Sequence, residues 1–112
     1  MNQPYVTTAA QFFKDTIPAL VASSSLTLPA PAVFQIGGKN GGVWSVDVVK
    51  KTVSEGQVPP PVSVMVIAEE RDFMALVEGR MSPADGVLTG RLTLVGDAVA
   101  IATLMEALTP SS

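Results

Sequence analysis

The sequence predicts an α+β fold, with a five-stranded, mostly antiparallel sheet covered on one face by helices. Two observations support it. Three segments, at 7–22, 72–81 and 97–108, carry apolar residues at helical spacing, and five short segments between 33 and 95 read as strands bounded by Gly or Pro. At 112 residues the chain suits one domain with one core, so we expect residues 1–112 to form a single domain.

The first segment predicts a helix over residues 7–22 with Thr7 or Thr8 as its N-cap. Its apolar face comprises Phe13, Ile17, Leu20 and Val21. Pro18 lies inside this pattern and should kink or split the helix, because proline removes a backbone donor. Residues 23–31, rich in Ser and Pro, then form a connector within the same domain.

A hairpin is predicted next, from strands at 33–36 and 43–48 joined by the glycine-rich residues 37–42. Trp44, Val46 and Val48 alternate onto one face of the second strand. A glycine-rich loop can cradle phosphate when a helix follows it, but a strand follows here, which disfavours that chemistry.

Two more strands complete this half of the chain. Residues 51–56 suit an exposed edge strand whose charges discourage pairing with other chains. Residues 57–61, with three consecutive prolines, predict an extended connection, and a polyproline ligand is the less favoured alternative. Residues 62–67 contain only Ser63 as a polar residue, which predicts a central strand buried on both faces.

The second helix is predicted from the apolar residues Phe73, Leu76, Val77 and Met81. It begins without a side-chain cap, since Ala68 stands at the expected position. The carboxylates of Glu69, Glu70 and Asp72 offset this by lying near the positive helix N-terminus. Metal binding or acid–base catalysis by these carboxylates is disfavoured, because the chain has no His.

The residues after this helix predict a sharp end, a new start and a strand. Gly79 suits the left-handed position after a helix, and Ser82 with Pro83 predicts the N-cap and first residue of another helical turn. After Gly90, a strand is predicted at 91–95, where Leu92 and Leu94 share one face.

The last helix is predicted from Asp97 as its cap, followed by Ile101, Leu104, Met105 and Leu108 on one face. Small and apolar residues also occupy most of its other positions. We therefore expect this helix to be buried on more than one side.

Composition excludes several classes of function. The chain has no Cys and no His, which removes disulfides, thiolate metal sites and the usual nucleophile–base pairs. A net charge of −3 without basic runs argues against nucleic-acid binding. Hydrophobic residues reach 47% and charged residues only 15%, against about 25% in ordinary domains. Three explanations for the many apolar residues remain open: a ligand cavity, a subunit interface, or an alanine- and valine-rich core.

The sequence shows no run of apolar residues that could span a bilayer, and its N-terminal residues do not resemble a signal peptide. The last residues do not form a peroxisomal address. We therefore expect a cytoplasmic protein.

Residues 72–96 carry a resemblance to a known family. The residues that match are Asp72-Phe73, Ala75-Leu76-Val77, Gly79-Arg80-Met81, Pro83, Gly90-Arg91-Leu92, Leu94 and Gly96. This segment resembles the signature of the sterol carrier protein family, the non-specific lipid transfer domain, and the likeness extends over roughly residues 33–105. The resemblance implies an α+β fold with a hydrophobic tunnel between sheet and helices that holds fatty acids, acyl chains, sterols or isoprenoids.

The resemblance implies a non-enzymatic protein that binds or transfers lipid, without a cofactor or metal. The candidate tunnel residues are Phe34, Trp44, Val46, Phe73, Leu76, Val77, Met81, Val87, Leu88, Leu92, Ile101, Leu104 and Met105. Each of them also suits an ordinary core. The first helix is viewed in the family as a lid or membrane-touching element, but packing on the sheet is the favoured explanation.

One departure from the family concerns Gly86, Val87 and Leu88, where relatives often place bulky aromatics. Here we expect a wider cavity or a looser wall. A second class of function also stays open: an accessory or oligomerisation module that forms a homodimer or presents a lipid-like substrate to a partner enzyme. Sterol-carrier-like domains play such parts in quinone synthesis and in alkylsulfatases.

Overall fold

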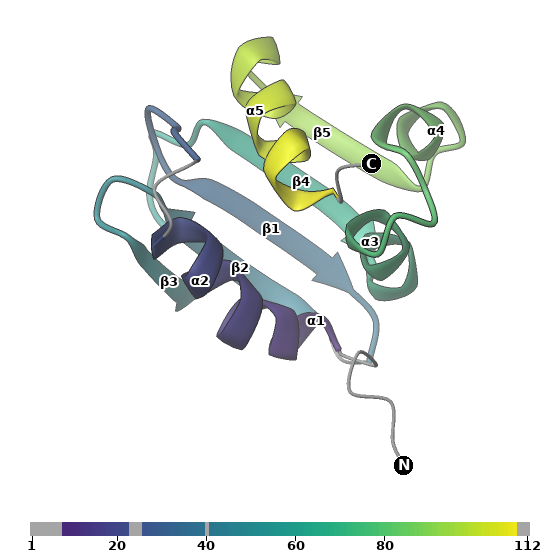
Figure 1. The fold of residues 1–112 in the computed structure, drawn as a ribbon, viewed down its shortest axis with the longest axis horizontal. Coiled ribbons are helices and arrows are strands. Elements are labelled where there is room, and N and C mark those ends of the chain that lie inside the picture. Colours follow the sequence, from purple (N-terminus) through teal and green to yellow (C-terminus); the bar gives the residue numbers. More distant parts are fainter. Residues whose placement is uncertain (1–7, 23–25, 40, 110–112) are drawn as a thin grey trace.

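The computed structural model describes residues 8–22, 26–39 and 41–109. Five strands form one sheet in the order β3-β2-β1-β4-β5 (Figure 1). Their bounds are β1 Ala32–Gly37, β2 Gly42–Asp47, β3 Thr52–Glu55, β4 Val64–Glu69 and β5 Leu92–Gly96. The β1–β4 pair is parallel and the other three pairs are antiparallel. The predicted α+β fold with a mostly antiparallel sheet is confirmed.

The helical elements gather on one side of this sheet (Figure 1). They are α1 Ala9–Gln11, the π-helical turn η1 Phe12–Thr16, α2 Ile17–Ala22, α3 Glu70–Val77, α4 Pro83–Leu88 and α5 Ala98–Leu108. The face of the sheet that they cover is called the inner face. Within the described part of the chain, none of these helices has the length and apolarity that a membrane crossing requires.

The inner face follows from the strand register. Phe34 pairs with Trp44 across the hairpin and with Val66 across the parallel pair, so these three side chains lie on the same face. All three are at most 6% exposed. The predicted alternation therefore describes the sheet correctly, and its inner face carries the core.

The outer face is partly covered by residues 56–61, which we call the strap. The Ser45 hydroxyl on β2 donates to the Gly56 carbonyl at 2.6 Å and accepts from the Val58 N–H at 3.1 Å. The Gln35 side chain on β1 donates to that of Gln57 at 3.3 Å. The predicted extended connection thus crosses beneath β2 and β1 to return the chain to the start of β4.

The fourth strand differs from its prediction. It starts at Val64 rather than at residue 62, and it lies between β1 and β5, so that β1 occupies the centre of the sheet. Val64 and Val66 on the inner face are fully buried, but Met65 and Ile67 on the outer face are only half-buried. The prediction of burial on both faces was therefore wrong, because the strap does not screen this part of the outer face.

Both α3 and α4 end in the same motif. Gly79 after α3 has a φ of 81°, and the Arg80 N–H reaches back to the Ala75 carbonyl at 2.8 Å. Gly90 after α4 has a φ of 76°, and the Arg91 N–H bonds to the Gly86 carbonyl at 2.9 Å. These are Schellman ends, in which glycine adopts the left-handed conformation that other residues avoid.

The helix starts also follow local chemistry. The Ser82 hydroxyl accepts from the Asp85 N–H at 3.1 Å, and the Asp97 carboxylate accepts from the Ala100 N–H at 3.0 Å. Both predicted caps are confirmed. The start of α3 has no side-chain cap, as expected, but its N-cap is Glu69 rather than Ala68.

The elements α1, η1 and α2 follow one another without a break and together form the first helix, which contains an irregular turn. Thr8 is the N-cap and accepts from the Gln11 N–H at 3.2 Å, while Thr7 lies outside the described residues, as do residues 23–25 of the connector. The Ile17 N–H bonds to the Phe12 carbonyl, five residues back, directly before Pro18. The predicted disruption at Pro18 takes the form of this π-turn, since proline has no N–H to continue the ladder.

A carboxylate from α3 holds the start of this helix in place. The Ala9 N–H donates to Glu70 Oε2 at 2.9 Å, across 61 positions of sequence. Glu70 lies in the first turn of α3, and its carboxylate accepts a hydrogen bond from an N–H at the start of the first helix, where the helix itself offers no acceptor. Of the three carboxylates expected near the start of α3, Glu70 therefore also joins two elements.

The last helix departs from the expectation of burial on several sides. Ala100, Leu104, Met105 and Leu108 are buried, whereas Val99 is 73% exposed and Ala102 is exposed. The helix is apolar nearly all round, but it covers the sheet with one face only.

We expect Glu70→Ala to lower the free energy of unfolding by about 1–2 kcal/mol, because it leaves the partly buried Ala9 N–H without its charged acceptor. Glu70→Gln keeps an acceptor and should lose less. Urea denaturation measures both, with Glu106→Ala on the exposed side of α5 as the control. Equal stability of Glu70→Ala and the control would contradict this role.

Removal of the Ser45 hydroxyl should loosen the strap. Ser45→Ala leaves the Val58 N–H and the Gly56 carbonyl without their partner, which should cost about 1–3 kcal/mol of unfolding free energy. Ser54 pairs directly with Ser45 on the neighbouring strand but is exposed, so Ser54→Ala is a matched control. If a thermal melt shows the same decrease in melting temperature for Ser45→Ala and Ser54→Ala, the Ser45 hydroxyl does not hold the strap.

Candidate functional site

An aromatic cluster lies between the inner face of the sheet and the first and third helices. The Phe13 ring stacks on Trp44 with centroids 4.5 Å apart and planes 8° apart, and on Phe73 at 5.5 Å and 13°. Phe34 meets Phe13 edge-on at 4.9 Å. Phe12 adds edge contacts to Phe13 and Phe73 at 5.8 and 5.5 Å. Such pairs stabilise a core by about 0.5–1.5 kcal/mol each beyond the area they bury.

The sequence-predicted tunnel residues fall into three groups. Nine of them belong to one buried cluster and two pack against it, and the remaining pair is exposed. The buried residues are Phe34, Trp44, Val46, Phe73, Leu76, Met81, Leu92, Leu104 and Met105, and those packed against them are Val77 and Ile101. Val87 and Leu88 are 47% and 83% exposed and do not join the cluster.

The expectation of a wider cavity at Gly86 was wrong. A Cβ added at Gly86 would lie 2.9 Å from Met81 Cε and 3.0 Å from Leu92 Cβ. The glycine is buried, and its neighbours fill the space that a side chain would need. Gly86 therefore allows close packing of α4 on the start of β5.

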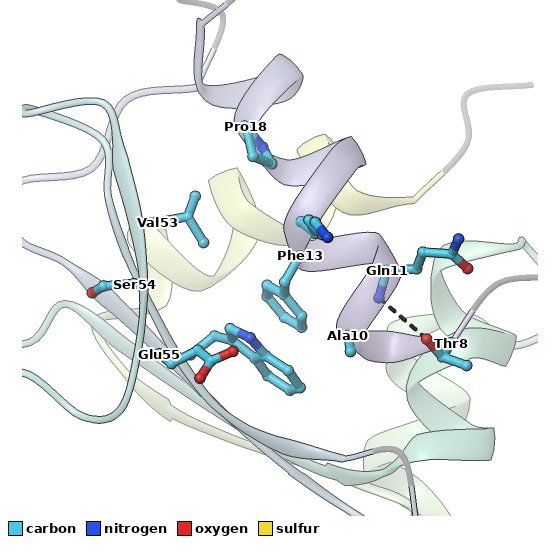
Figure 2. Close-up of a pocket in the computed structure, with 10 residues that line it drawn as sticks. Thr8, Ala10, Gln11, Phe13, Pro18, Val53, Ser54 and Glu55 are labelled. Carbon is cyan, nitrogen blue, oxygen red and sulfur yellow. Dashed lines mark hydrogen bonds between the residues drawn. The ribbon is translucent and has the colours of Figure 1, made fainter.

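A cleft of about 660 Å³ opens between the first helix and the edge strand β3 (Figure 2). It is lined by Thr8, Ala10, Gln11, Phe13, Lys14, Pro18, Trp44, Val53, Ser54 and Glu55. Phe13 and Trp44 are nearly buried, at 1% and 6% exposure, and Val53 is half-buried, whereas Lys14 and Glu55 are exposed. The cleft thus combines an aromatic base with one cation and one carboxylate at its rim.

Of the thirteen predicted site residues, Trp44 alone lines this cleft. Phe13 was recognised from the sequence only as a helix-face residue, although it forms the contact between the cleft and the cluster. Its helical spacing relative to Ile17 and Val21 indicated burial. The contacts of Phe13 depend on the strand register, which places Phe34 next to Trp44 on the inner face of the sheet.

A second hollow, of about 470 Å³, lies where β1 and β4 end. Its polar lining includes Gln35, Glu69, Asp72 and Arg91, and it contains none of the predicted tunnel residues. Within residues 8–22, 26–39 and 41–109, no group of three or more His, Cys, Asp or Glu is placed to hold a metal ion.

Comparisons with known proteins give one family model and a curated relative. The family model described as the SCP-2 sterol transfer family matches residues 26–109. The chain is 32% identical over 66 residues to hydroxysteroid dehydrogenase-like protein 2 of Danio rerio; the match covers 57% of this chain and 16% of that protein.

Solved structures show the same fold. The crystal structure of sterol carrier protein 2 like 2 from Aedes aegypti superimposes with a TM-score of 0.70 at 24% identity, covering 87% of this chain and 94% of that one. The solution structure of that mosquito protein in palmitated form gives a TM-score of 0.72 at 22% identity, covering 91% and 95%. With most of its length matched by the family model, the chain belongs to the SCP-2 sterol transfer family.

Proposed function

We propose that this chain binds a fatty acyl chain or another lipid, without catalysing a reaction, between the inner face of the sheet and the helices. The observation that carries the proposal is the continuity of the cleft with the aromatic cluster. Phe13 and Trp44 line the cleft and stack on each other, and Phe13 also contacts the interior residues Phe34 and Phe73. Membership of the family and the palmitated form of the mosquito structure support this ligand class.

The size and lining of the cleft suit a lipid. Its volume of about 660 Å³ lies within the roughly 300–1,000 Å³ of small-molecule sites. Burial of an acyl chain contributes about 0.8 kcal/mol for each CH₂ group, so the apolar base supplies the affinity. Lys14 at the rim provides a cation for an acidic head group, while Glu55 disfavours a second negative charge.

Eleven of the predicted residues remain candidates for ligand contact in this proposal, namely the nine buried ones together with Val77 and Ile101. Val87 and Leu88 are left out because they face solvent. The whole 112-residue chain acts as one lipid-binding domain, and its contact with a membrane is transient and hydrophobic.

Narrowing the cleft tests the proposal. Val53→Phe adds a ring where β3 lines the cleft, and we expect it to weaken binding of a fluorescent long-chain fatty acid about tenfold or more, which corresponds to about 1.4 kcal/mol. Trp44 is the chain's sole tryptophan, so binding is measured by energy transfer from its emission to the fluorophore.

The control is Val95→Phe, which adds the same ring on the opposite edge strand, where Val95 is 54% exposed. It should bind like the native protein. Native mass spectrometry of the purified protein reports any lipid carried from the cell. A native protein that carries no lipid and does not bind the fatty acid would overturn the proposal.

A second function is favoured by one comparison. The chain matches only 16% of the Danio rerio relative, so a domain of this kind occurs within a much longer protein named for a dehydrogenase. On this alternative the chain is an accessory module that presents a lipid-like substrate to an enzyme or forms a homodimer. Failure to bind fatty acid, together with a dimer or larger complex in size exclusion, would favour it.

A further inference from the structure

The Phe13 ring occupies the boundary between the cleft and the interior. It is among the residues that line the cleft, yet only 1% of it is exposed, so the ring closes the base of the cleft. Figure 2 shows this ring pointing from the helix toward the sheet. The ring stacks on Trp44, which also lines the cleft, and on the interior residue Phe73, and it meets Phe34 edge-on.

The backbone that carries this ring is the least regular helical segment of the described chain. Phe13 is the second residue of the π-turn Phe12–Thr16, a rare helical form that occurs mostly as single turns and frequently at functional sites. Pro18 follows and donates no N–H to the turn before it. A local rearrangement at Phe13 therefore breaks fewer backbone hydrogen bonds than one elsewhere in a regular helix.

Trp44, the other aromatic residue at the base of the cleft, is held more firmly. It lies in the middle of β2, paired with Phe34 on β1 and with Glu55 on β3. A shift of the Trp44 backbone would disturb two strand pairs, whereas a shift of the Phe13 backbone changes only a helix that packs on the sheet.

From this geometry we infer that Phe13 is the gate of the lipid site: its ring separates the cleft from the interior, and an acyl chain enters by displacing it. The inference rests on the proposed lipid-binding function and adds to it the route of entry and the residue that limits the rate. Phe13 is also a specificity residue, since the space left when the ring moves sets the thickness of chain admitted.

Stopped-flow mixing with a fluorescent long-chain fatty acid, followed by energy transfer from Trp44, tests the gate. Phe13→Ala should raise the association rate about tenfold, because binding no longer waits for a conformational change. The control is Phe12→Ala. Phe12 is the adjacent ring and is 9% exposed, and it contacts Phe13 and Phe73 but does not line the cleft.

Because Phe13→Ala also removes core contacts, Phe13→Leu provides a second variant with most of the apolar volume kept. It should accelerate association less than Phe13→Ala and more than Phe12→Ala. Association at the native rate in both Phe13 variants, with native binding intact, would overturn the gate and leave the proposed function standing. Absence of binding in the native protein would overturn both.

Discussion

The stacking of Phe13 between Trp44 and Phe73 is the contact that sets the first helix on the sheet. It joins three elements that are distant in sequence, the first helix, β2 and α3, and it does so over Phe34 on the central strand β1. Glu70 adds a polar link between the first helix and α3 at 2.9 Å. Together these contacts place the helix on the sheet and shape the cleft between it and β3.

Features with a local cause could be predicted from the sequence. The caps Ser82 and Asp97 each bond to an N–H three residues away, and Gly79 ends α3 within one turn. Strand order has no such local cause. The parallel pairing of β1 with β4, and the hydrogen bond that Glu70 makes across 61 positions, depend on which segments meet in three dimensions.

For the candidate site, the sequence could predict which side chains are buried but not which of them face a ligand. Alternation and helical spacing identified Phe34, Phe73 and Leu104 as interior residues, which they are. Burial does not reveal whether a side chain faces a ligand or another ring, so the significance of Phe13 was missed. Gly86 was misread for a related reason, because a missing side chain leaves space only if its neighbours do not fill it.

The many apolar residues of the sequence lie mainly in two separate regions of the structure. The aromatic ones lie in the core beside β3 and the cleft. Most of the exposed aliphatic side chains lie toward the other edge of the sheet, with Leu88 on α4, Val95 on β5 and Val99 on α5, whereas Val49 lies between β2 and β3. The proposed lipid cleft and most of the exposed aliphatic side chains therefore lie at opposite edges of one sheet. The two functions that the sequence left open are structurally compatible, because a lipid in the cleft leaves these side chains exposed.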